Sequence, residues 1–140
     1  MNLSPHFTLE ELTVTDHRTL DNTPDDDAKV HLYRLAQFLE QVKEVLQFKP
    51  ILVNSAYRSA AVNAACGSRD TSQHRLGCAA DIRVPGMTPD AVVRAVMASG
   101  LAYDQIIREL TWTHISIPNT PEAKPRKMAL IIDKAGTRLF

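Results

Sequence analysis

A histidine and an aspartate stand seven residues apart in the segment SQHRLGCAAD, residues 72–81. Gly77 and the three small residues after it allow the chain to turn tightly from a loop into a strand, so Gly77 is expected to adopt a positive φ or to lie against another backbone. His74 and Asp81 would then lie side by side and bind one metal ion. A catalytic zinc takes three protein ligands and keeps a fourth position open. A third ligand must therefore come from elsewhere.

His114 is the candidate for that third ligand. Polar and apolar residues alternate in WTHISI, residues 112–117, so Trp112, His114 and Ser116 would share one face of a strand. A single histidine is more often a hydrogen-bonded structural residue than a metal ligand. The combination of two histidines and one aspartate in this arrangement favours a metal site.

The other histidines and acids fit ordinary structural roles. Asp25, Asp26 and Asp27 precede an apolar helical pattern, and acids in a first helical turn interact favourably with the helix dipole. No second ligand stands at a useful spacing from the three remaining histidines, so surface or packing roles are expected for His6, His17 and His31.

Three segments in this order resemble the zinc D-alanyl-D-alanine peptidases: SAYRS at 55–59, SQHRLGCAAD at 72–81 and WTHISI at 112–117. FTLEEL and DNTP near the start are similar to the small bacteriophage and prophage murein peptidases of that superfamily. The resemblance runs from about Phe7 to Ile117 and implies Zn²⁺ bound by His74, Asp81 and His114. It also implies hydrolysis of peptide bonds in bacterial peptidoglycan stem peptides, of the D-alanyl-D-alanine carboxypeptidase or murein endopeptidase type.

That activity requires a base for the water activated by the metal, whose pKa zinc lowers to about 7. Glu109 is the candidate, and a solvated carboxylate or a pair with Arg108 is the alternative. Several branches of the superfamily place this acid three residues before the last histidine, where this chain has Thr111. Glu109 stands five residues before His114, so on one unbroken strand the two would face opposite sides. A bend, a bulge or a tight hairpin is therefore required, and Asp104 is the second candidate.

The remaining site candidates would contact the substrate. Arg58 is similar to the family's arginine near the scissile carbonyl, where a guanidinium stabilises a developing oxyanion; a structural salt bridge is the alternative. Candidate substrate-binding residues are Ser72, Gln73, Trp112 and Tyr57. Loop capping explains the first two almost as well, Trp112 suits the core equally, and the role of Tyr57 is open.

Helices are expected early in the chain. A short one spans 8–12, and a long one follows Pro24, because apolar residues recur at steps of mostly three and four: Val30, Leu32, Leu35, Leu39, Val42 and Leu46. A third begins at SAAVNAAC, and a fourth spans TPDAVVRAVMAS, with Thr88 as its cap, proline at its first position and Gly100 past its end.

Strands are expected at PILVNS (short and buried), CAADIRV, YDQIIRE, WTHISI, KMALIID and TRLF. Helices followed by mostly hairpin-connected strands predict an α+β fold, in which N-terminal helices pack on a small, mostly antiparallel sheet. The resemblance implies the same architecture, that of the D-Ala-D-Ala peptidases and hedgehog-like domains.

Composition predicts one globular domain over 1–140, with a packing arm at 1–24 and a tail of unclear role at 118–140. The 16 basic and 16 acidic residues cancel, which disfavours nucleic acid and anionic membranes as partners. Neither a signal peptide nor a membrane span is recognisable. We expect a monomer made in the cytoplasm that acts at the cell wall or periplasm, as a phage endolysin or virion component.

Cys66 and Cys78 lack the spacing of a structural zinc site and are expected to be small packing residues. A Cys78 thiolate that reached the metal would close the site. Two alternatives to the enzyme remain at this stage. One is a non-catalytic module that binds wall peptides or a protein partner, and the other is a virion or tail component in which zinc is structural.

Overall fold

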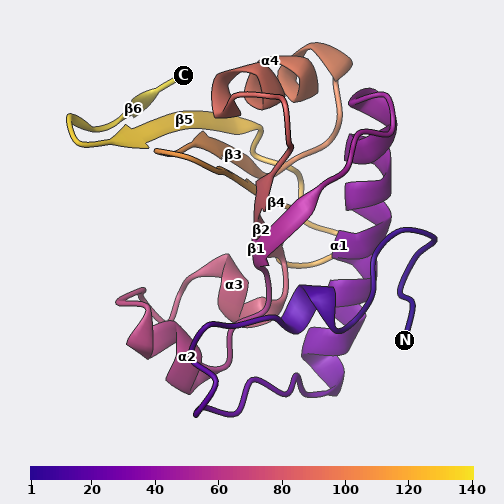
Figure 1. The fold of residues 1–140 in the computed structure, drawn as a ribbon, viewed down its shortest axis with the longest axis vertical. Helices are drawn as coiled ribbons and strands as arrows, with labels where there is room; N and C mark the ends of the chain where they lie inside the picture. Colours follow the sequence, from indigo (N-terminus) through magenta and orange to yellow (C-terminus); the bar gives the residue numbers. More distant parts are fainter.

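The computed structural model describes residues 1–140 and has an α+β architecture, as predicted (Figure 1). Its helices are η1 (Glu11–Thr13), α1 (Asp26–Val45), α2 (Ala60–Ala65), α3 (Gln73–Leu76) and α4 (Pro89–Ser99). Its strands are β1 (Leu52–Ser55), β2 (Ala79–Arg83), β3 (Gln105–Arg108), β4 (Thr113–Ser116), β5 (Met128–Asp133) and β6 (Gly136–Leu139). They form one six-stranded sheet in the order β1-β2-β4-β3-β5-β6, in which only the β3–β5 pair is parallel.

The long helix α1 supplies much of the core. Its N-cap Asp25 accepts a hydrogen bond from the Ala28 N–H at 2.8 Å, and Asp26 and Asp27 occupy the first turn, where the helix dipole favours them. Its buried residues are Ala28, Leu32, Leu35, Ala36, Phe38, Leu39 and Val42. Val30 does not belong to this face and is 61% exposed, because two residues of helix turn it roughly 200° away from Leu32.

The arm before α1 lies against it. Leu3, Phe7 and Leu12 are buried in the core, and the Ser4 hydroxyl donates a hydrogen bond to Glu40 of α1 at 2.6 Å. The only helical turn in the arm is η1, which starts and ends later than the short helix expected at 8–12. None of the helices combines the length and the apolar character that a membrane-spanning helix requires.

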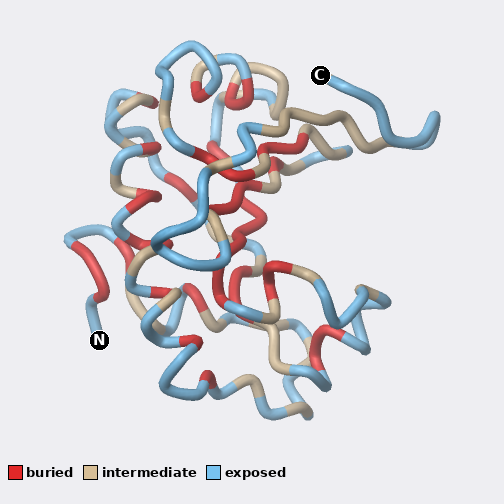
Figure 2. The backbone as a smooth tube through the Cα atoms, turned by 180° about the vertical axis from the view of Figure 1, so that it is seen from behind, coloured by how far each residue is buried: buried red, intermediate tan, exposed pale blue.

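The pair β2–β4 lies in the middle of the hydrophobic core (Figure 2). Ala79, Ala80 and Ile82 of β2 and Ile115 of β4 are fully buried. In the register of this pair, Asp81 lies directly opposite His114, so their side chains leave the same face of the sheet. Strand β1 was expected to be buried, but it is an edge strand with only β2 as neighbour, and Leu52 is exposed.

Helix α4 has the predicted boundaries. The Thr88 hydroxyl accepts a hydrogen bond from the Ala91 N–H at 3.1 Å, Pro89 starts the helix, and Gly100 follows it with φ +76°. Its buried valines, Val92, Val93 and Val96, lie in the core against the sheet, where α4 contacts β3 and β4.

The segment after Pro118, whose role the sequence left unclear, completes the sheet. Strand β5 pairs in parallel with β3, and β6 returns along β5. The Pro118 carbonyl accepts a hydrogen bond from Arg34 of α1 at 3.0 Å, and the Phe140 N–H donates to the Ala129 carbonyl at 3.1 Å. The β5–β6 hairpin nevertheless projects from the body of the molecule, and all four residues of β6 are exposed (Figures 1 and 2).

Candidate metal centre

The sequence suggested that His74 lies at the edge of a loop, but it lies on the short helix α3. The Ser72 hydroxyl caps this single turn by accepting a hydrogen bond from the His74 N–H at 3.2 Å. Gly77 ends the turn with φ +82°. A Cβ at Gly77 would lie 3.0 Å from the Ala28 carbonyl oxygen and 3.1 Å from Leu32 Cγ. Glycine therefore lets α3 pack tightly against α1. It has both features that the sequence predicted, a positive φ and a close approach to another backbone.

The three predicted ligands come together. Asp81 Oδ1 lies 3.0 Å from His114 Nδ1 and 3.4 Å from His74 Nε2. The two imidazole rings meet edge to face, with centroids 5.2 Å apart. One ligand atom from each residue lies within 4.8 Å of the others. The helix α3 and the paired strands β2 and β4 thus converge on one point.

The hydrogen bonds of His74 indicate that this point suits a cation. His74 is 3% exposed, and its Nδ1 lies 2.7 Å from the Ala56 carbonyl oxygen, so Nδ1 carries the proton and donates it. Burial lowers the pKa of His74, which leaves a neutral ring whose Nε2 lone pair faces the Asp81 carboxylate. Two electron-rich atoms in this arrangement repel each other unless a cation lies between them.

The carboxyl group of Asp81 is ionised. Burial alone would raise the pKa of its carboxyl, but the hydrogen bond with His114 outweighs that effect and holds the pKa far below its ordinary value. Two imidazole nitrogens and one carboxylate oxygen form a donor set found at catalytic zinc sites. The residues present therefore fit a zinc ion with one open coordination position.

Arg58 holds the second oxygen of Asp81. Its Nη2 donates to Asp81 Oδ2 at 3.2 Å, its Nε to Ser55 Oγ at 3.0 Å and its Nη1 to Ser68 Oγ at 3.1 Å. The structural salt bridge, which the sequence left as an alternative, is thus present. Arg58 also lines the cavity over the metal centre, so contact with a substrate oxygen stays a prediction.

Glu109 reaches the cavity through the tight hairpin that its spacing required. Strands β3 and β4 are joined by residues 109–112, with the Glu109 N–H bonded to the Trp112 carbonyl at 3.0 Å. The indole Nε1–H of Trp112 donates to Glu109 Oε2 at 2.8 Å. Burial, followed by the negative charge of Asp81, raises the pKa of Glu109, which suits a group that exchanges protons during a reaction.

Two of the predicted site residues, Asp104 and Tyr57, do not line the cavity. The Asp104 carboxylate is buried and accepts hydrogen bonds from Arg126 at 2.6 Å and Gln73 at 3.0 Å, which leaves it unsuited to act as the base. Tyr57 belongs to the hydrophobic core and is also absent from the cavity wall, so it does not contact a substrate there. Its backbone N–H donates to the Leu12 carbonyl at 2.9 Å.

Cys78 does not close the metal site. It is fully buried in the core, and burial raises the pKa of its thiol to about 11, so the thiol stays protonated at neutral pH. It stands outside the group of potential ligands. Cys66 is a free, exposed cysteine.

The cavity over the metal centre has a volume of about 510 Å³ and a mainly polar wall. Besides the three predicted ligands, Arg58 and Glu109, it is lined by the predicted residues Ser72, Gln73 and Trp112. Sequence reasoning missed Gln105 and Ile107, although the alternation in β3 places Ile107 beside His114. It also missed Arg126 and Ile132, for which no local pattern exists because β5 reaches β3 across a long connection.

An α+β fold with a His-Asp-His centre under a polar cavity is the architecture of a metal-dependent hydrolase. A family profile described as Peptidase M15 matches residues 5–116. The chain therefore belongs to the peptidase M15 family, within the zinc peptidase superfamily that the motifs predicted, and is a metallopeptidase by family. The match includes all three predicted ligand positions and ends at Ser116, before β5 and β6. A search of curated proteins finds no match.

Proposed function

We propose that this protein is a zinc-dependent peptidase that hydrolyses bonds in the stem peptides of bacterial peptidoglycan, as a D-alanyl-D-alanine carboxypeptidase or a murein endopeptidase. The observation that carries the proposal is the set of His74, Asp81 and His114 on the wall of an open polar cavity that also holds Glu109. Three protein ligands leave the fourth position of a zinc ion free. A closed structural site would use four.

Each residue has a defined task in this proposal. Bound zinc would supply Lewis-acid activation of a water and of the scissile carbonyl. Glu109 takes the proton from the attacking water and returns it to the leaving amine. Trp112 holds Glu109 Oε2 through its indole N–H, which leaves Oε1 for the water. Arg58 fixes Asp81 and presents positive charge where an oxyanion develops.

The biological setting is part of the same proposal and rests on the sequence resemblance. FTLEEL and DNTP are similar to phage and prophage murein peptidases. We therefore propose that a phage or prophage encodes the protein, that it is made in the cytoplasm, and that it reaches the wall during lysis or with a virion.

Digestion of purified peptidoglycan tests the function. Zinc-loaded protein should release fragments that share one new type of amino and carboxyl end, identified by mass. Glu109→Gln should bind zinc equally and release no fragments above background, because an amide cannot accept the proton of water. If the wild type binds zinc but releases nothing, the protein is a non-catalytic module.

A further inference from the structure

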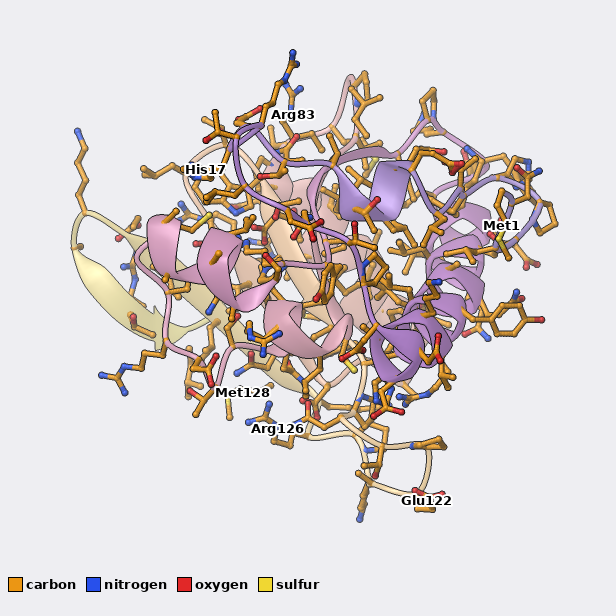
Figure 3. The ribbon with its side chains drawn as sticks, turned by 90° about the horizontal axis from the view of Figure 1, so that it is seen from below. Met1, His17, Arg83, Glu122, Arg126 and Met128 are labelled. Atoms are coloured by element: carbon orange, nitrogen blue, oxygen red, sulfur yellow. The ribbon has the colours of Figure 1, made fainter.

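Arg126 is a cavity residue that the family match does not include. It lies between the match, which ends at residue 116, and strand β5. Its side chain is 50% exposed and lines the cavity together with Gln73. Figure 3 shows Arg126 beside Met128 at the start of β5, while Glu122 lies farther out on the preceding loop.

A buried carboxylate orients this guanidinium. Asp104 Oδ2 accepts hydrogen bonds from Arg126 Nη2 at 2.6 Å and Nε at 3.0 Å, and Oδ1 accepts from the Arg126 backbone N–H at 3.0 Å. Asp104 itself is held by Gln73 Nε2 at 3.0 Å. The Nη1 group of Arg126 takes no part in this pair. An arginine fixed in this way loses little conformational entropy when it binds a ligand.

The free hydrogen-bond donors in the cavity favour Arg126 as the group that binds a carboxylate of the substrate. The other arginine there, Arg58, uses Nε, Nη1 and Nη2 in bonds to the protein. The acids of the cavity are Asp81, a proposed metal ligand, and Glu109, the proposed base. Arg126 thus offers positive charge and a free donor, and the planar guanidinium matches the geometry of a carboxylate.

The sheet register gives the distance from the reaction centre. The Met128 N–H donates to the Asp104 carbonyl at 2.9 Å, and the Arg126 backbone also binds Asp104, so Arg126 enters the cavity level with Asp104. His114 pairs with Ile107 in the sheet, and Ile107 stands three residues after Asp104 in the chain. Three residues of strand span roughly 10 Å, which is the length of about three residues of an extended peptide.

We propose that Arg126 binds a free carboxylate of the substrate peptide, about three residues from the scissile bond. This inference rests on the proposed function and specifies its substrate: an anionic peptide. Stem peptides offer two sources of that group, the C-terminal carboxylate and the free α-carboxylate of a D-glutamyl residue.

Two pairs of synthetic stem peptides test the proposal. In one pair the C-terminus is a free acid or an amide; in the other the D-glutamyl carboxylate is free or amidated. For the pair that Arg126 recognises, the wild type should show a KM about 10- to 100-fold lower for the acid, the range expected for a charged hydrogen bond. The pair that shows the preference identifies the source of the carboxylate.

Variants assign the preference to Arg126. Arg126→Gln should abolish it, and Arg126→Lys, which keeps a cation beside Asp104, should retain only part of it. Arg138→Gln is the matched control, because Arg138 stands in the same C-terminal segment, pairs with Asp133 and does not line the cavity. Calorimetric binding of the same peptides to zinc-loaded Glu109→Gln should give the same ratios without turnover.

Three outcomes contradict the proposal in different ways. If the wild type cleaves acids and amides with equal KM, the inference is wrong and the proposed function stands. If Arg126→Gln raises the KM of acid and amide by the same factor, Arg126 only supports Asp104. If the wild type neither binds nor cleaves any of the peptides, the proposed function fails and the inference fails with it.

Discussion

The chemistry of single side chains in this site depends on the groups that hold their other atoms. The Ala56 carbonyl fixes the tautomer of His74, Arg58 takes one oxygen of Asp81, and Trp112 takes one oxygen of Glu109. Residue type and spacing predicted the group of possible ligands. They could not predict the partners of Asp104 and Tyr57, because these partners come from segments far apart in the sequence.

Loss of one ligand should remove the metal. The wild type should bind one zinc ion, and His114→Ala should lose most of the affinity, because two protein ligands do not satisfy a zinc ion that takes three or four. His31→Ala is the control: His31 lies on α1 beside Arg34, with 2.8 Å between Nδ1 and Nη1. Metal content after dialysis and competition with a chelator measure the effect. Unchanged stoichiometry in His114→Ala would exclude it as a ligand.

Arg58→Lys should reduce turnover more than it reduces zinc affinity. A lysine ammonium can stay near Asp81, but it cannot donate at once to Ser55, Ser68 and Asp81 as the planar guanidinium does. We expect kcat/KM to fall at least tenfold while zinc stoichiometry stays at one. Wild-type kcat/KM in the variant would assign Arg58 a purely structural role.

The ionisation of Glu109 should be visible through Trp112, the single tryptophan. Burial and then Asp81 raise the pKa of Glu109 above 4.5, so its proton is held more tightly in the folded than in the unfolded chain. Glu109 therefore costs stability as the pH rises past its ordinary pKa. In metal-free protein, tryptophan emission should titrate with a midpoint above 4.5. The same titration of Glu109→Gln should lack this transition; an unchanged curve would assign it to another group.

At the scale of elements, long periodic segments were predictable and short ones were not. Helices α1 and α4 carry apolar residues at helical spacing, with caps at Asp25 and Thr88, so their boundaries follow from the sequence. Helix α3 has only four residues, too few for a 3.6-residue period to show. Its single turn depends on the Ser72 cap and on Gly77, and the sequence therefore suggested a loop there.

Gly77→Ala should weaken zinc binding without changing a ligand. The new Cβ would meet the Ala28 carbonyl and Leu32 at a positive φ, at a cost of about 1 to 3 kcal/mol, and the shift would displace His74. Gly67→Ala is the matched control, because Gly67 has φ +74° and a Cβ added there would meet nothing within 4 Å. Both variants carry the strain of a positive φ, but only Gly77→Ala adds the contact with α1. Urea unfolding and zinc titration of both variants therefore distinguish the effect of the strain from the effect of the contact. Equal zinc affinity in Gly77→Ala and wild type would contradict a role for Gly77 in shaping the metal site.

For the whole molecule, the long-range pairing of β3 with β5 is the feature that the sequence could not reveal. The strands themselves follow from local patterns, but nothing local indicates that β5 runs parallel to β3 and closes one side of the cavity. In Figure 3, Arg126 lies on the opposite side of the molecule from His17 and Arg83. The part of the chain beyond the family match thus contributes to the wall of the site.

Zinc should protect the centre of the sheet but not its outer hairpin against hydrogen exchange. Amides in β2 and β4 are surrounded by fully buried residues and should exchange only when the whole domain unfolds. A ligand at about 100 times its Kd stabilises the native state by about 2.7 kcal/mol, which slows such amides about 100-fold. The amides of β6, whose four residues are all exposed, should exchange through local opening and change less than about twofold. Mass spectrometry of exchange with and without zinc measures both. Equal slowing of β6 would mean that the hairpin opens only with the core, while no slowing of β2 and β4 would mean that zinc does not bind the native fold.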